Sequence, residues 1–267
     1  MEGAFCCDLF VIETMFPDLT TLLIVCPLVF LGGLVDAIAG GGGLITLPGY
    51  LIAGVPPHMA IGTNKLSSAM GMFISTIRLY RGGFIDMKLA TVPVAAAFVG
   101  SIVGARIALM LPASVFQLIL IICLPVAAAL VMRKKTLSPE GEAMEIKKRW
   151  LLLGLCSFAC GAYDGFYGPG AGTFLLLAFA AVAKLGVRDA AGQMKIVNFS
   201  SGIAALVTFA VAGQVDWVLG ASAGVFGIAG HYIGAGLVMK NGSRIVRPII
   251  ITVLAILFVK TGWDYWA

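Results

Sequence analysis

The chain has 267 residues, of which 60% are hydrophobic and 12% charged, and its net charge is +5. Soluble domains carry about 25% charged residues, so this composition leaves little room for a soluble domain and predicts an all-α polytopic membrane protein in a lipid bilayer. The basic residues lie between the apolar runs, where orientation signals belong, so the positive charge does not indicate a nucleic-acid partner.

The first half of the chain contains five apolar elements joined by short turns. The first spans about residues 20–39. The second, at about 44–53, reaches only about half of the hydrocarbon core at 1.5 Å per residue, so we expect a re-entrant hairpin. Three full crossings are predicted at about 59–80, 87–110 and 115–132.

The second half repeats this plan after one long polar linker, residues 133–149, which carries six basic residues. Its elements are predicted at about 150–167, 173–184, 190–212, 217–239 and 245–261. We therefore expect a single transmembrane domain over residues 1–267, with repeat one at 19–132 and repeat two at 150–262.

A carboxylate and a helix-breaking run occur together once in each half. Asp36 lies in an apolar run and is followed four residues later by Gly40, Gly41, Gly42 and Gly43. Each glycine costs about 1 kcal/mol of helix stability relative to alanine, so the helix should break there. The pattern returns after Asp164, with the breaker run Gly168, Pro169, Gly170, Ala171 and Gly172. Two interrupted apolar segments at matching places in two halves are typical of the midplane site of a secondary transporter.

Like residues recur at a fixed separation in the two halves. The residue numbers of Asp36 and Asp164 differ by 128, and six further pairs differ by 130: Gly62/Gly192, Lys65/Lys195, Gly83/Gly213, Asp86/Asp216, Gly100/Gly230 and Gly104/Gly234. Six pairs in register exceed chance, so the halves are interpreted as duplicates.

The distribution of Lys and Arg predicts the orientation of each half. The linker at 133–149 is expected to be cytoplasmic, and the acidic N-terminus periplasmic. Each half is then a hairpin plus three crossings. The copies therefore lie in opposite senses, as an inverted repeat whose two breaks point toward a shared centre.

Helix starts at the breaks are candidate anion sites. A half-helix presents unpaired N–H groups and the positive end of its dipole at its N-terminus, which is suited to an anion. Thr46 follows the first break and Thr173 the second, each with a hydroxyl to donate. The alternative is that the glycines only allow close helix packing.

Polar residues continue past the breaks as Thr63, Asn64 and Lys65 in the first half and as Lys195 and Asn198 in the second. A lysine inside a membrane span is expensive, so each should either bind substrate or extend to the interface from a helix end. Asp36 and Asp164 could carry protons in coupling or pin the broken backbone structurally. Both pairs of alternatives remain open at this point.

These motifs together resemble a known family. The stretch GGLVDAIAGGGGLITLP with residues 60–65, and YDGFYGPGAGTF with residues 195–201, is similar to the TauE/SafE-type sulfite exporter family and its bacterial membrane-transporter branch. The resemblance implies an inner-membrane exporter of small anions such as sulfite or organosulfonates, driven by the proton gradient. It also implies a substrate site at Gly40–Gly43, Thr63–Lys65, Gly168–Gly172, Lys195 and Asn198.

Two other functions remain as alternatives. A passive anion channel would use the same breaks and basic residues, and an intramembrane enzyme is disfavoured because the motifs of such enzymes are missing from the sequence. We expect no catalytic residues, no metal site and no cofactor, since the six cysteines form no metal-like cluster. The expected partner is a small anionic substrate, and the oligomeric state is left open, a homo-oligomer included.

Overall fold

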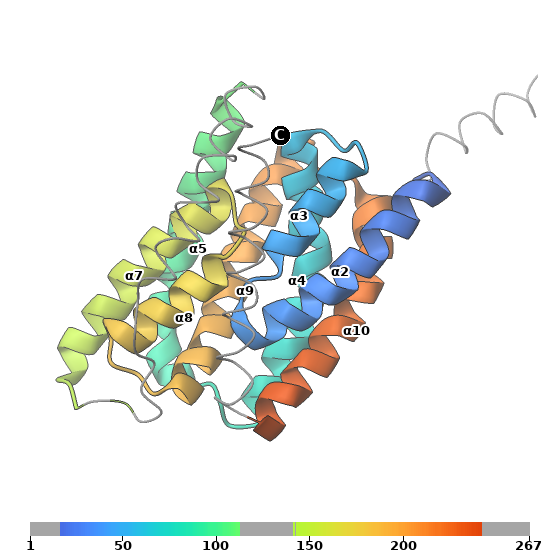
Figure 1. The fold of residues 1–267 in the computed structure, drawn as a ribbon. Coiled ribbons are helices and arrows are strands. Elements are labelled where there is room, and N and C mark those ends of the chain that lie inside the picture. The colour runs from blue at the N-terminus through green and yellow to red at the C-terminus, as the bar shows by residue number, and fades with distance from the viewer. Residues whose placement is uncertain (1–16, 113–140, 142, 242–267) are drawn as a thin grey trace, which may run out of the picture.

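A computed structural model describes residues 17–112, 141 and 143–241 of the chain, and all of their regular structure is helical (Figure 1). The helices are α2 (Leu19–Ala39), α3 (Gly43–Ile52), α4 (Pro57–Arg81), α5 (Met87–Met110), α7 (Ile146–Phe166), α8 (Ala171–Ala181), α9 (Val187–Val211) and α10 (Trp217–Asn241). Four of them, α2, α5, α9 and α10, are long and apolar enough to cross a membrane. The prediction of an all-α polytopic membrane protein is confirmed. The crossings predicted at 115–132 and 245–261 lie outside the described residues.

Local signals in the sequence determine where these helices begin. Pro57 is the first residue of α4, a position where its missing N–H costs nothing. The Asp86 carboxylate accepts hydrogen bonds from the N–H groups of Lys88 and Leu89 and so caps α5, and Asp216 caps α10 through the Leu219 N–H. One boundary differs from the prediction: α7 begins at Ile146 rather than Trp150, so the end of the predicted polar linker is helical.

Both predicted breaks are present, and each is followed by a half-length helix. Helix α2 ends at Gly40, whose φ of 75° lies in the left-handed region, and the ten-residue α3 starts at Gly43. Helix α7 ends at Phe166, and the eleven-residue α8 starts at Ala171 after two further left-handed glycines. A residue with a Cβ pays about 1–2 kcal/mol in this region, which is why glycine occupies these turns.

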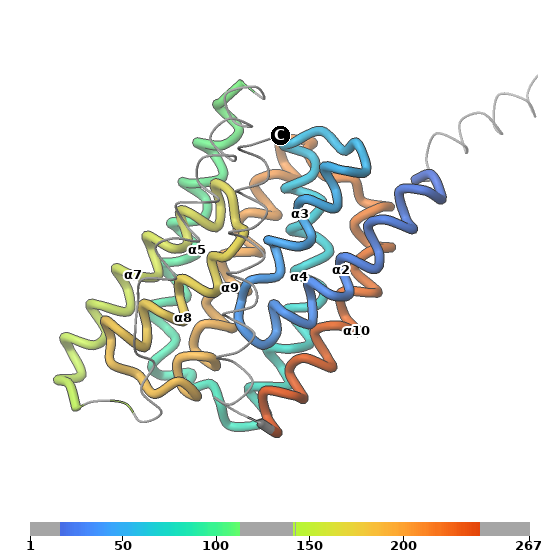
Figure 2. The backbone as a smooth tube through the Cα atoms, in the orientation of Figure 1, coloured from blue at the N-terminus to red at the C-terminus, as the bar shows by residue number. Residues whose placement is uncertain are grey.

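The helices form two bundles, and each bundle contains one helix from the other half of the chain. Helices α2 and α4 of the first half pack with α10 of the second, and α3 packs on α2 and α4. Helices α7 and α9 of the second half pack with α5 of the first, and α8 packs on α7 and α9. Figure 2 shows the two groups side by side, with α4 and α9 in the middle. The last described helix of each half is thus exchanged.

Corresponding helices of the two halves run in opposite directions. In Figure 1, α2 descends from the N-terminal end of the described chain, whereas its counterpart α7 ascends from the lower left. The packing repeats with the same symmetry: Gly62 lies against the backbone carbonyl of Gln214, and its counterpart Gly192 lies against that of Phe84. Gly62 and Gly192 are 130 residues apart, and so are Phe84 and Gln214. The separation that predicted the duplication therefore also relates one contact to the other.

Candidate functional site

The two breaks lie against each other at the boundary between the bundles. A Cβ added to Gly172 would come within 2.7 Å of the Gly40 Cα, and a Cβ on Gly43 would lie 3.1 Å from the Pro169 Cα. The Thr173 hydroxyl donates a hydrogen bond of 2.9 Å to the Ala39 carbonyl and so joins the second break to the first. The two breaks therefore meet, as the expectation of a shared centre requires.

Two buried ion pairs flank the breaks, and each joins one half of the chain to the other. Lys65 Nζ on α4 lies 2.7 Å from Asp164 Oδ1 on α7. Lys195 Nζ on α9 lies 2.9 Å from Asp36 Oδ2 on α2 and donates a second hydrogen bond to the Asp36 carbonyl at 2.6 Å. The lysines and aspartates that the sequence singled out separately are therefore partners in a crossed arrangement.

Both lysines are buried well inside their helices. Each is the ninth residue of its helix, about 12 Å from the helix start at 1.5 Å per residue. Lys65 is 5% exposed and Lys195 is fully buried. Their burial and ion pairs do not favour the snorkelling alternative, because the other half of the chain covers both lysines and supplies a carboxylate to each.

The carboxylates make further contacts that differ between the two sides. Asp36 Oδ1 accepts a hydrogen bond of 3.3 Å from the N–H of Gly42 across the first break. Asp164 Oδ2 instead accepts a bond of 2.7 Å from the Ser201 hydroxyl. Asp36 is therefore attached to the broken backbone itself, whereas Asp164 is attached to α9.

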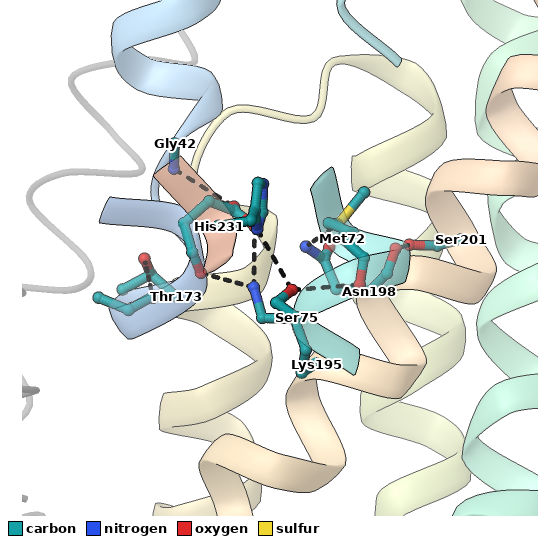
Figure 3. A network of polar contacts seen from close by, with 10 residues as sticks. Gly42, Met72, Ser75, Thr173, Lys195, Asn198, Ser201 and His231 are labelled. Atoms are coloured by element: carbon teal, nitrogen blue, oxygen red, sulfur yellow. Dashed lines mark hydrogen bonds and ion pairs between the residues drawn. The ribbon is translucent and has the colours of Figure 1, made fainter. Parts of the chain in front are cut away.

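His231 is a member of the site that sequence reasoning missed. It lies on α10 and is 2% exposed, with its Nε2 3.8 Å from Asp36 Oδ2 and its Nδ1 3.2 Å from the Ser75 hydroxyl oxygen (Figure 3). We define the first centre as Asp36, Lys195 and His231. The second centre is Asp164, Lys65 and Ser201. A histidine inside an otherwise apolar, glycine-rich helix was the available signal, and its distance in sequence from Asp36 concealed it.

A small cavity adjoins the first centre. Asp36, Gly42, Thr46 and His231 are among the residues that line it, and its volume is about 10 Å³, which is room for about one water molecule. The Thr46 hydroxyl is buried and has no hydrogen-bond partner. A buried polar atom without a partner costs about 1–3 kcal/mol, so this hydroxyl is available to a molecule that enters the cavity.

The remaining predicted site residues lie farther from the breaks. The Asn198 amide donates to the Met72 sulfur at 3.4 Å, while its oxygen has no partner. Asn64 accepts a long bond of 3.5 Å from Ser68. Thr63 accepts a bond of 2.9 Å from the Asp216 N–H at the start of α10, so its hydroxyl is used in joining α4 to α10.

We expect Thr63→Val to destabilise the protein by about 1–3 kcal/mol, because the Asp216 N–H loses its acceptor in a partly buried place. Thr63→Ser keeps the hydroxyl and should retain most of the stability. The measurement is thermal unfolding in detergent micelles, followed by tryptophan fluorescence. A large rise in the half-saturating concentration of the transported anion, with stability unchanged, would contradict this assignment and support a direct substrate contact.

Comparisons with known proteins agree with the membrane fold. The family profile described as "Sulfite exporter TauE/SafE" matches residues 25–261. The chain is 34% identical over 237 residues to "Probable membrane transporter protein YfcA" of Escherichia coli strain K12, covering 88% of this chain and 87% of that protein. It is 32% identical over 231 residues to "Probable membrane transporter protein ORF9" of Sinorhizobium sp, covering 86% and 88% of the two chains. No solved structure matches significantly.

Proposed function

Because this chain belongs to the TauE/SafE sulfite exporter family of membrane transporters, we propose that it exports small anions, namely sulfite, organosulfonates or related sulfur oxyanions, coupled to the proton gradient. We place it in the bacterial inner membrane, with the linker at 133–149 in the cytoplasm and the N-terminus in the periplasm. In this function the chain moves the anion across the membrane and catalyses no chemical step.

The observation that carries the proposal is the meeting of the two breaks between two crossed ion pairs. The short helices α3 and α8 begin at the breaks, and helix starts favour negative charge. The two lysine ammonium groups flank the breaks and already hold anions, the carboxylates of Asp36 and Asp164. A substrate anion would compete with these carboxylates for the same ammonium groups.

In this proposal the described conformation is a closed intermediate of the transport cycle, without room for substrate. The cavity beside the first centre is about 10 Å³, which is too small for a sulfur oxyanion because a water molecule alone needs about that much. Substrate entry therefore requires the bundles to separate at the breaks on one side of the membrane. Movement of one bundle against the other around a fixed central site is the usual form of alternating access in inverted-repeat transporters.

The test is uptake into proteoliposomes that contain the purified protein, with sulfite, sulfoacetate and thiosulfate offered one at a time under pH gradients of either sign. We expect at least one of these anions to be taken up with a saturable rate that responds to the pH gradient. Empty liposomes are the control.

Two results would contradict the proposal in different ways. An unsaturable flux that ignores the pH gradient would identify a passive channel. The absence of flux for all three anions, from protein that remains folded after reconstitution, would remove the sulfur-oxyanion assignment.

A further inference from the structure

The two centres differ chemically although the fold that holds them is repeated. His231 faces Asp36 in the first centre, and the residue at the corresponding place of the first half, 130 positions earlier, is Ser101. The Ser101 hydroxyl donates to the Ser201 carbonyl at 2.6 Å. Of the two centres, only the first therefore contains an imidazole, whose ring nitrogens can bind a proton.

The fold makes room for the imidazole with two glycines. A Cβ on Gly71 would collide with the His231 ring, and a Cβ on Gly33 would lie 3.0 Å from its Cδ2. The counterpart of Gly71 is Ser201, which fills the equivalent space and binds Asp164. The histidine is thus built into the first side, whereas the second side is completed by a hydroxyl that does not titrate.

The hydrogen bonds around His231 are compatible with a proton on Nδ1. The Ser75 hydroxyl oxygen lies 3.1 Å from the Met72 carbonyl oxygen and 3.2 Å from His231 Nδ1, so in this tautomer the ring donates to the Ser75 oxygen while the hydroxyl donates to the carbonyl. A neutral imidazole carries one proton, and Nε2 is then left as an acceptor. This bare nitrogen faces another acceptor, Asp36 Oδ2, at 3.8 Å, beside the water-sized cavity.

We propose that His231 Nε2, beside Asp36, is the proton-binding atom of the transport cycle, and that the second centre is a structural pin without a coupling role. This inference rests on the proposed function, proton-coupled anion transport. The proton enters through the cavity, on the water that the Thr46 hydroxyl and Asp36 can hold. Protonation gives the ring a positive charge that pairs with the Asp36 carboxylate, whose Oδ2 lies 3.8 Å from Nε2.

Charge balance couples this proton to the anion. With a neutral ring, the first centre has no net charge, because Lys195 and Asp36 cancel. A proton on His231 leaves the centre positive, and an anion beside the break restores neutrality in a place where unpaired charge is costly. Each ligand therefore raises the affinity for the other, by the same factor. The proton and the anion then cross the membrane together in the same direction. An inward proton gradient therefore opposes export, and export occurs when the outward gradient of the anion is the larger of the two.

Two charged side chains lie beside the ring among the described residues. Asp36 approaches it from α2, and Lys195 of α9 binds the same carboxylate oxygen, Asp36 Oδ2. From α4 the ring receives only the Ser75 hydroxyl. Arg78, one turn farther along α4, is stacked 4.0 Å from the centre of the Tyr232 ring and bonds the Tyr232 carbonyl on the exposed side of α10.

The first test is His231→Gln in proteoliposomes, with sulfite, sulfoacetate and thiosulfate as probes. We expect accumulation driven by a pH gradient to fall about 5- to 150-fold, the usual span of coupling between two ligands. Exchange of the same anion at equal pH should fall much less, because it needs no net proton movement. The control is His58→Gln, which removes the only other histidine of the chain and should preserve the response to the pH gradient.

The second test does not depend on the folding of a variant. Because the chain has two histidines, ¹⁵N-imidazole labelling gives two ring spectra, and His58→Gln assigns them. We expect the His231 ring to gain a proton as the pH is lowered, at a higher pH when the transported anion is present.

Three outcomes separate the inference from the proposed function. A His231 ring that stays neutral over the whole pH range of transport overturns the inference, as does a His231→Gln protein that accumulates anion as strongly as the wild type. In both cases uptake by the wild type still supports the proposed function. If the wild type moves none of the three anions, the proposed function fails instead.

Discussion

Replacing Lys195 by methionine is expected to destabilise the protein by about 3–5 kcal/mol and to abolish transport. The change leaves the Asp36 carboxylate buried without its cation, and the loss of one partner of a buried pair costs this much. Lys195 is fully buried and bonds both the carboxylate and the carbonyl of Asp36. Unfolding in detergent micelles gives the first quantity, and proteoliposome uptake gives the second.

A double-mutant cycle separates the interaction energy between Lys195 and Asp36 from the interactions of each residue with its other neighbours. Asp36→Asn combined with Lys195→Met removes both charges, so we expect the double variant to be more stable than Lys195→Met alone. Lys88→Met is the matched control, because Lys88 is exposed and surface changes usually stay within about 0.5 kcal/mol. Equal stability losses in Lys195→Met and Lys88→Met would contradict the idea that the crossed pairs hold the two halves together.

Adding a single methyl group at the contact of the breaks is expected to be almost as damaging. Gly40→Ala should destabilise the protein by about 2–5 kcal/mol, because its Cβ would both collide with the Gly172 backbone and sit at a left-handed φ. The collision forces backbone to move, which typically costs about 1–3 kcal/mol, and the left-handed φ adds about 1–2 kcal/mol.

Two further variants distinguish these causes. Gly54 has a φ of 83° and nothing within 4 Å of an added Cβ, so Gly54→Ala measures the cost of the φ angle alone. No left-handed φ is recorded for Gly172, so Gly172→Ala measures the collision alone. Unfolding in micelles would give all three values. If Gly40→Ala costs no more than Gly54→Ala, the breaks do not touch in the folded protein.

Much of the fold was predictable because it depends on local chemistry. Runs of glycine weaken a helix, and the four at Gly40–Gly43 end α2, while carboxylates such as Asp86 cap a following helix, so the helix ends could be inferred from a few neighbouring residues. The fixed separation of like residues predicted the duplication. Which surfaces would then meet was not available from that separation, because it depends on how the two halves pack.

The site could be predicted only as a set of residues. Asp36, Asp164, Lys65 and Lys195 stood out because charges are costly in an apolar span, but their crossed pairing depends on contacts between distant helices. His231 could not be placed beside Asp36 without knowing that α10 packs on α2. Thr63 looked like part of the substrate path until the Asp216 N–H was found on its hydroxyl. The substrate roles of these residues stay predictions.

The exchange of α5 and α10 between the bundles bears on how such a chain could arise. A polypeptide with only one half would have, as the last of the helices described here, one that packs on the opposite half. It would reach a complete bundle only by associating with a second copy inserted upside down. The product of an ancestral gene for one half would thus have had to insert into the membrane in both orientations. Fusion of two copies of the gene would then have fixed one copy in each orientation within a single chain.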